Sequence, residues 1–117
     1  MTFHLDLPYL NYILDIIKDI EESTDNISED KFLKNKDIRD ANIRRLDIIG
    51  ETIKSFSKDI KNKYNNTNWD EFIGIKDRVT NQYFGVDFNL IWSMLKKGVP
   101  LLKEQILKIK KDFDKHT

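Results

Sequence analysis

The sequence predicts an all-α protein, folded as an antiparallel bundle of four to five helices. Apolar residues recur at three- and four-residue intervals over several long segments, and this spacing places them on one face of a helix. No segment shows the sustained alternation of apolar and polar residues that is typical of strands. The chain has 117 residues, 39% of them hydrophobic, which is enough for one core but too few for two. We therefore expect a single domain over residues 1–117.

The first predicted helix begins at Leu7. Pro8 fits its first turn, where a missing backbone N–H has little cost. Its apolar face consists of Leu10, Ile13, Leu14, Ile17 and Ile20. The segment 23–27 is polar, and Ser28 then supplies a capping side chain, followed by acidic residues that favour a helix start. A short second helix around Phe32 is the consequence.

A long amphipathic helix is predicted over about 36–64, a segment without proline. Its apolar residues are four and three positions apart, at Leu46, Ile49, Ile53, Phe56 and Ile60. The asparagine-rich stretch 65–68 should end it, because short polar side chains compete for backbone hydrogen bonds. Asn68 and Glu71 resemble a capping box around Trp69, so another helix should start there.

That next helix is expected from about Trp69 to Tyr83. It should end near Gly85, because glycine tolerates the left-handed conformation that closes many helices. Asp87 can cap the following helix, whose apolar stripe consists of Phe88, Ile91, Leu95, Leu102, Ile106, Ile109 and Phe113. The segment 98–100 contains glycine and proline, so a kink or break is expected there, and the lysine-rich end is expected to fray.

Composition restricts the partners and the compartment. Twenty basic and twenty acidic residues cancel, so a contact with nucleic acid must come from a local patch. The absence of cysteine excludes disulfides and cysteine-based zinc sites. His4 and His116 lie near opposite ends of the sequence, so no metal site is expected. No signal-peptide pattern and no long apolar run is present, which favours a cytoplasmic protein without a membrane partner.

The densest run of polar functional groups lies between Lys76 and Phe84. On a regular helix Lys76 and Tyr83 would share a face, because seven residues make nearly two turns. Arg78 and Asn81 would also be neighbours. Spacing alone favours a plainer explanation, in which these are solvated helix residues and Tyr83 anchors the last turn in the core.

Two separated motifs add a family resemblance. The first comprises Asn68-Trp69, then Gly74-Ile75-Lys76-Asp77-Arg78-Val79-Thr80-Asn81-Gln82-Tyr83-Phe84-Gly85-Val86-Asp87, then Ile91-Trp92. The second comprises Asp40-Ala41, Arg44-Arg45-Leu46 and Ile48-Ile49-Gly50-Glu51. Together they span most of the chain and resemble the HepT-like toxin ribonucleases of the HEPN superfamily. The hallmark of that family is an Arg, four to six intervening residues, a His, any residue and a Tyr.

The chain departs from this hallmark at two positions. Counting back from Tyr83 places Asn81 where the family has His, and Lys76 where it usually has Arg, with Arg78 as the less favoured alternative. A neutral amide cannot take up and release a proton near neutral pH, whereas an imidazole can. Lys76 keeps a positive charge but lacks the two-pronged grip of Arg on phosphate. We therefore expect weak or absent cleavage, whether the chain is a naturally degenerate member or a deliberately disabled toxin.

The resemblance implies the toxin of a type II toxin–antitoxin system, a metal-independent endoribonuclease that cleaves RNA without a cofactor and acts as a homodimer. It also implies a nucleotidyltransferase antitoxin that attaches AMP to Tyr83. The implied site consists of catalytic Lys76, Asn81 and Tyr83, supported by Arg78, Arg45 and Glu51. For Arg45 and Glu51, a solvated helix face with charge pairs is an equally good explanation. The alternative function is a non-catalytic binding protein, either a degenerate toxin or a substrate-binding subunit that partners a nucleotidyltransferase.

Overall fold

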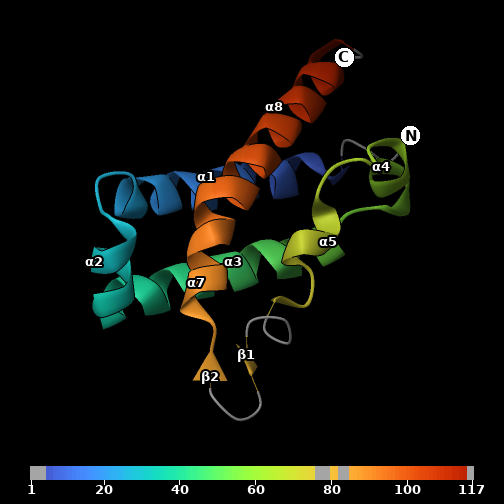
Figure 1. The fold of residues 1–117 in the computed structure, drawn as a ribbon. Coiled ribbons are helices and arrows are strands. Elements are labelled where there is room, and N and C mark those ends of the chain that lie inside the picture. The colour runs from blue at the N-terminus through green and yellow to red at the C-terminus, as the bar shows by residue number, and fades with distance from the viewer. Residues whose placement is uncertain (1–4, 76–79, 82–84, 116–117) are drawn as a thin grey trace.

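The computed structural model describes residues 5–75, 80–81 and 85–115. Most of these residues are helical, and the predicted all-α class is confirmed (Figure 1). The helices are α1 (Leu7–Thr24), α2 (Glu29–Lys34), α3 (Lys36–Lys54), α4 (Lys58–Lys63), α5 (Trp69–Phe72), α7 (Phe88–Ser93) and α8 (Val99–Lys115), with a π-helical segment, η2 (Met94–Gly98), between the last two. Two short strands, β1 (Thr80–Asn81) and β2 (Gly85–Val86), form an antiparallel pair that the sequence did not predict.

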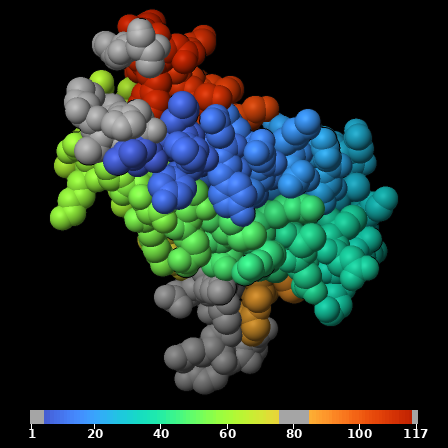
Figure 2. Space-filling view, turned by 180° about the vertical axis from the view of Figure 1, so that it is seen from behind, coloured from blue at the N-terminus to red at the C-terminus, as the bar shows by residue number. Residues whose placement is uncertain are grey.

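Helices α1 and α3 lie side by side in opposite directions, and α2 fills the connection between them (Figures 1 and 2). Their starts follow the predicted chemistry. Pro8 occupies the first turn of α1, and Ser28 Oγ accepts a hydrogen bond from the Lys31 N–H at 3.1 Å, which caps α2. Asn35 caps α3 in the same way, accepting from the Ile38 N–H at 3.0 Å.

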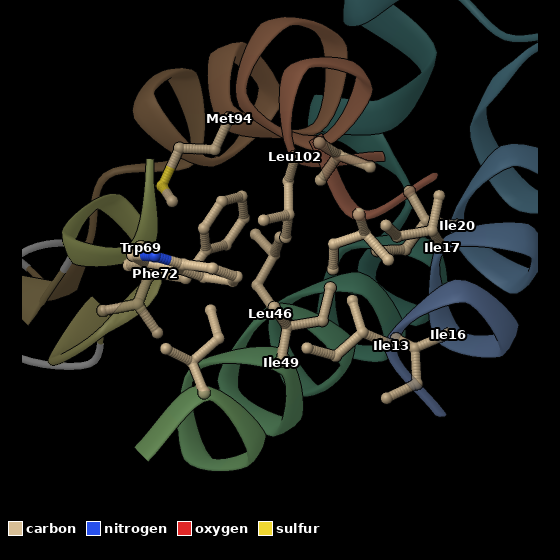
Figure 3. Close-up of a cluster of buried hydrophobic side chains, with 14 of the residues drawn as sticks. Ile13, Ile16, Ile17, Ile20, Leu46, Ile49, Trp69, Phe72, Met94 and Leu102 are labelled. Atoms are coloured by element: carbon tan, nitrogen blue, oxygen red, sulfur yellow. The ribbon is translucent and has the colours of Figure 1, made fainter. Parts of the chain in front are cut away.

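The hydrophobic core lies where α1, α3, α5 and the last helical segment meet (Figure 3). The predicted apolar stripes supply it, and burial of each large side chain is worth about 1.5–3 kcal/mol. Buried residues that the figure labels are Ile13, Ile16, Ile17 and Ile20 from α1, Leu46 and Ile49 from α3, Trp69 and Phe72 from α5, Met94 from η2, and Leu102 from α8. Leu14, predicted for the α1 stripe, is only partly buried.

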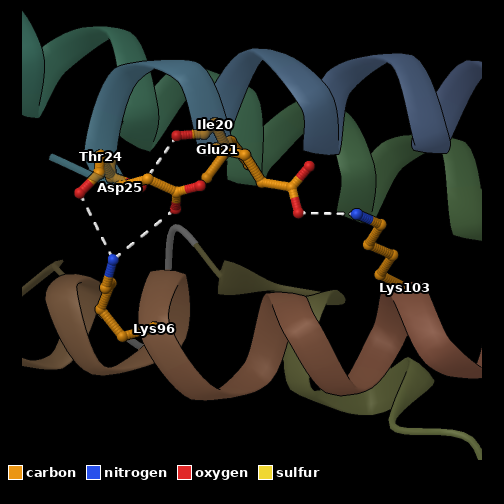
Figure 4. A network of polar contacts seen from close by, with 6 residues as sticks. All are labelled: Ile20, Glu21, Thr24, Asp25, Lys96 and Lys103. Carbon is orange, nitrogen blue, oxygen red and sulfur yellow. Dashed lines mark hydrogen bonds and ion pairs between the residues drawn. The ribbon is translucent and has the colours of Figure 1, made fainter.

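Polar contacts orient the last helical segment against α1 (Figure 4). Lys103 Nζ donates to Glu21 Oε2 at 2.8 Å. Seven residues earlier, Lys96 Nζ donates to the Thr24 carbonyl oxygen at 3.3 Å and lies 3.9 Å from Asp25 Oδ1. Half-exposed pairs of this kind contribute little net stability, so their effect is to fix the rotation of η2 and α8 on the surface of α1.

The π-helical segment η2 ends at Gly98, the first residue of the segment 98–100 where a kink or break was predicted, and it continues directly into α8. At its end, a Cβ on Gly98 would overlap a carboxylate oxygen of Glu71, so glycine here leaves room for the end of that side chain. Asn68 Nδ2 donates to Glu71 Oε2 at 2.7 Å and to the Gly98 carbonyl oxygen at 3.2 Å. The predicted capping box is therefore wrong, because Asn68 bonds the Glu71 side chain and not the helix backbone. The lysine-rich end does not fray but remains helical to Lys115.

The single helix predicted over 36–64 is wrong, because the chain divides into α3 and α4 at positions 55–57. The buried Asp6 carboxylate stabilises this break, because it accepts hydrogen bonds from the Ser57 N–H at 2.9 Å and from Ser57 Oγ at 2.7 Å. Ser57 Oγ in turn accepts from the Ile60 N–H at 3.2 Å and caps α4. Charge-assisted hydrogen bonds to a residue 51 positions away thus set the break. No glycine or proline marks it in the sequence.

Tyr64 joins α4 to two other helices. Its hydroxyl donates to Asp112 Oδ2 on α8 at 2.8 Å, and its carbonyl oxygen accepts from the indole N–H of Trp69 at 3.1 Å. Burial of the phenol, and secondly its hydrogen bond to Asp112, raises the pKa of Tyr64 to about 12. The folded protein therefore favours the protonated phenol.

Replacing Tyr64 by Phe should lower the free energy of unfolding by about 1 kcal/mol near neutral pH, because one side-chain hydrogen bond is lost. The sign of the pH dependence follows from the raised pKa. The contribution of Tyr64 is fully present below pH 10.0, where the unfolded phenol is protonated, and it is lost as the pH rises toward about 12. Urea unfolding of both proteins at about pH 8 and about pH 11 measures this convergence. The exposed Tyr12→Phe is the control, and an equal effect there would refute the assignment.

Candidate functional site

A pocket of about 150 Å³ lies between the C-terminal half of α3 and the segment that follows α5. One wall comes from α3 and the other from the chain around the left-handed Gly74, whose φ is 72°. The lining residues are Asp47, Gly50, Glu51, Lys54, Phe72, Gly74 and Ile75. The second family motif, which contains Gly50 and Glu51, thus faces the beginning of the first.

Gly50 brings the two walls together. A Cβ at this position would overlap the carbonyl oxygen of Phe72 and would lie 3.1 Å from the Phe72 carbonyl carbon. Because these are backbone atoms, a larger residue could be accommodated only by moving α5 away from α3. The glycine in the motif therefore has a packing role that spacing alone did not reveal.

Three charged side chains line the pocket. The Asp47 side chain is 9% exposed, and its Oδ2 lies 3.8 Å from Arg44 Nη1. Glu51 Oε1 accepts from Lys54 Nζ at 3.2 Å, and both of these side chains are exposed. Carboxylate oxygens accept hydrogen bonds, so this wall suits the hydroxyl groups of ribose or the amino groups of bases better than it suits phosphate.

The sequence suggested two supporting residues on α3, Glu51 and Arg45, and only one of them lies at the pocket. Glu51 lines the pocket. Arg45 does not: its Nη1 donates to Asn42 Oδ1 at 3.2 Å, and the Asn42 amide donates to Ser23 Oγ at 3.0 Å. Arg45 therefore belongs to the contact between α3 and α1.

Sequence reasoning missed two pocket residues, Asp47 and Lys54. Their spacing contained the necessary signal, because Asp47, Glu51 and Lys54 stand at i, i+4 and i+7 and share one face of α3. Only the apolar stripe of that helix was followed, so its polar stripe beside Gly50 was not recognised.

The positions predicted to be catalytic lie beyond the pocket along the chain. Lys76, Arg78 and Tyr83 lie outside the described residues. Asn81 is described through its backbone, which pairs with Gly85 in the β1–β2 ladder. Ile75 is the last pocket residue and immediately precedes Lys76. The residues from Lys76 to Tyr83, which we call the motif segment, therefore follow directly on the pocket wall in the sequence.

The helix predicted from Trp69 to Tyr83 is wrong. Helix α5 ends at Phe72, where Ile73 has extended backbone angles and Gly74 turns left-handed. Asn81 lies in a strand, so the helical spacing that would have placed Arg78 beside it does not apply. Gly85 does adopt the predicted left-handed conformation, with φ of 84°, but within a strand pair and not at a helix end.

The described residues contain no group of three or more His, Cys, Asp or Glu side chains that could hold a metal ion. None of their helices has both the length and the apolarity that crossing a membrane requires. His4 and His116, which the sequence did not favour as ligands, lie outside these ranges.

A comparison with protein families identifies the family of this chain. Residues 13–109 match the family described as Ribonuclease HepT-like, and this range includes every pocket residue and the whole motif segment. The chain belongs to the HepT-like ribonuclease family. The resemblance seen in the sequence is therefore confirmed at the level of the family.

Curated relatives support the same HepT-like assignment. The chain is 47% identical over 108 residues to a Methanocaldococcus jannaschii protein named "Gamma-glutamylcyclotransferase and putative RNase". That match covers 92% of this chain and 49% of the relative, so the chain spans about half of its length. A second protein of that organism, a "Putative RNase", is 38% identical over 106 residues, covering 91% and 88% of the two chains.

A third relative carries the family name itself. The "Probable ribonuclease HepT" of Thermococcus cleftensis is 37% identical over 103 residues, covering 88% of this chain and 94% of the relative. No solved structure matches the chain.

Proposed function

We propose that this HepT-like chain is the cytoplasmic toxin of a type II toxin–antitoxin pair, an endoribonuclease weakened by Asn81 and Lys76. The observation that carries the proposal is the continuity of the α3 pocket with the motif segment through Ile75. RNA with a ribose or base in this pocket would have its backbone beside Ile75, the residue that precedes Lys76 in the sequence. The family assignment of residues 13–109 supports RNA as the substrate.

The expected division of labour follows from side-chain chemistry. Lys76, or Arg78 in its place, would stabilise the negative charge that develops on the phosphorus. Asn81 can hydrogen-bond a phosphate or a ribose hydroxyl but cannot transfer a proton, which the family's His can do. Glu51 would orient the ribose or base from the pocket. Binding of RNA should therefore survive better than its cleavage.

The proposal includes a homodimer in which the motif segments of two protomers face each other across one RNA groove. The β1–β2 pair stands away from the helical core at one end of the molecule, which leaves it accessible to a second chain (Figure 1). Two copies would supply the basic and polar groups for one RNA strand from both sides. Such an arrangement fits the small size of the α3 pocket in one protomer, about 150 Å³.

A second function is favoured by the departures at Asn81 and Lys76 themselves. Both changes remove catalytic chemistry, so the chain would be a non-catalytic binding protein, a degenerate toxin or a substrate-binding subunit that partners a nucleotidyltransferase. The deciding experiment is RNA cleavage in the presence of a chelator by a chain with the family's His and Arg restored. Cleavage supports the nuclease, and its absence supports the binding protein.

Tyr83 is the proposed acceptor of AMP from a nucleotidyltransferase antitoxin. A phosphoryl group there would repel the RNA backbone by like charge. Incubation with a nucleotidyltransferase of this kind and ATP should increase the protein mass by one AMP, and Tyr83→Phe should keep its mass. Tyr12→Phe, which removes an exposed hydroxyl on α1, should still be modified. Modification that persists in Tyr83→Phe would exclude Tyr83 as the acceptor.

A further inference from the structure

The charges of this chain cancel in number but not in position. Residues 1–53 carry seven basic and twelve acidic side chains, whereas residues 54–117 carry thirteen basic and eight acidic. The net charges of the two parts are therefore −5 and +5. A segregated charge of this size can create a local attractive field even when the whole protein is neutral.

Five lysines of the basic part gather on α4 and α8, and we call them the lysine face: Lys58, Lys61, Lys108, Lys111 and Lys115. On α8 they stand at i, i+3 and i+7, which is one side of the helix, and on α4 they are three apart. The Tyr64 hydroxyl bonds Asp112 at 2.8 Å and joins the two helices at this point. This hydrogen bond ties together two lysine-bearing segments about fifty positions apart in sequence.

Several lysines elsewhere in the described part of the chain pair with carboxylates. Lys34, Lys36, Lys54 and Lys103 each lie within 3.2 Å of a carboxylate oxygen. Within the described ranges, no ion pair is recorded for any member of the lysine face. Like charges at helical spacing destabilise a helix slightly. A polyanion that contacts several of these lysines at once would relieve that repulsion along both helices.

We propose that the lysine face is a second RNA-binding surface, which holds the phosphodiester backbone of the substrate away from the cleavage site. RNA as the partner rests on the proposed function. The lysine face would bind phosphates and not the bases, since lysine supplies point charges without base-specific geometry. It complements the pocket, whose carboxylates suit hydroxyl and amino groups and repel phosphate.

The position of the lysine face sets a length requirement. The end of α8 and the β1–β2 pair lie at opposite ends of the molecule, whose longest extent is 47 Å (Figure 1). A short RNA cannot contact both regions of one chain, whereas a longer RNA can. The lysine face should therefore strengthen the binding of long RNA and leave the binding of very short RNA nearly unchanged.

The test is the triple variant Lys58→Glu, Lys108→Glu, Lys111→Glu, whose three positions are all exposed. Fluorescence anisotropy with a single-stranded RNA of about 20 nucleotides should show affinity at least about tenfold weaker at low salt. The dependence of log affinity on log salt should become shallower by about 2, because three phosphate contacts to a single strand are removed. An RNA of about four nucleotides should lose little affinity.

The matched control is Lys18→Glu, Lys31→Glu, Lys34→Glu, which makes the same change in net charge on exposed positions of the acidic part. If the control weakens binding equally, net charge explains the effect and the lysine face is rejected. It is also rejected if the unaltered chain binds no RNA, or if the triple variant keeps its affinity and salt dependence. Circular dichroism checks folding, and Lys→Gln at the same three positions replaces the Glu variant if that one unfolds.

One further variant separates the test of the lysine face from the test of the proposed nuclease function. The same three Lys→Glu changes are placed in a chain that also carries Asn81→His and Lys76→Arg. Cleavage with unchanged affinity for long RNA would reject the lysine face alone. Weakened RNA binding in a chain that never cleaves would support the lysine face and reject the nuclease.

Discussion

Replacing Asn81 by His and Lys76 by Arg together should make this chain cleave RNA about a hundred- to ten-thousand-fold faster than the unaltered chain. The restored imidazole can take up and release a proton near neutral pH, which the amide of Asn81 cannot do. The restored guanidinium grips phosphate through two parallel hydrogen bonds, where Lys76 offers a point charge. The rate increase corresponds to roughly 3 to 5 kcal/mol of barrier.

Cleavage of a labelled RNA at several pH values, in the presence of a chelator, measures this effect. Activity should change near the ordinary imidazole pKa of about 6.5 in the restored chain and not in the unaltered one. The matched control is Asn81→Gln with Lys76→Arg, which repeats the basic change but supplies only another amide. If that control cleaves as fast as the His variant, proton transfer at position 81 is not the missing step. If no variant cleaves RNA, the binding-protein alternative stands.

The two candidates for the basic position can be separated in the same background. Removing Arg78 from the restored chain should have a small effect if position 76 faces the phosphate. A loss as large as that caused by reverting Arg to Lys at position 76 would assign the role to Arg78 instead.

Gly50→Ala should lower the free energy of unfolding by about 1–3 kcal/mol, even though alanine is the better helix former by about 0.5–1 kcal/mol. The added methyl group would overlap the backbone carbonyl of Phe72, so α5 must move away from α3. That movement opens the contact between the pocket walls and should loosen the chain before Lys76. Urea unfolding measures the stability change, and faster amide exchange over Trp69–Phe72 would locate it.

Gly98→Ala provides the control for this prediction. Its added methyl group would meet the end of the Glu71 side chain, which can rotate away, and not a backbone atom. The expected loss is therefore smaller than for Gly50→Ala. Equal losses at the two positions would show that the overlap with the Phe72 backbone is not the dominant effect.

The fold class followed from the sequence because apolar spacing is a local property. The stripes that include Ile13, Ile17, Leu46 and Ile49 are buried as predicted, and Ser28 caps its helix as its position suggested. The same local reasoning failed at positions 55–57, where Asp6 ends a helix from 51 residues away. It also failed after Phe72, where Gly74 interrupts a segment that otherwise has helical composition.

The sequence by itself determined the all-α class, the core stripes and the HepT-like family, and it predicts that the catalytic chemistry departs from that family at Asn81 and Lys76. These depend on residue identity and on spacing within one helix, which the chain displays directly. Only the tertiary structure decided that Gly50 lets α5 pack on α3, that Glu51 lines a pocket while Arg45 does not, and that Tyr64 joins the end of α4 to α8. Each of these depends on contacts between residues far apart in sequence, and such contacts are selected by the packing of the whole core.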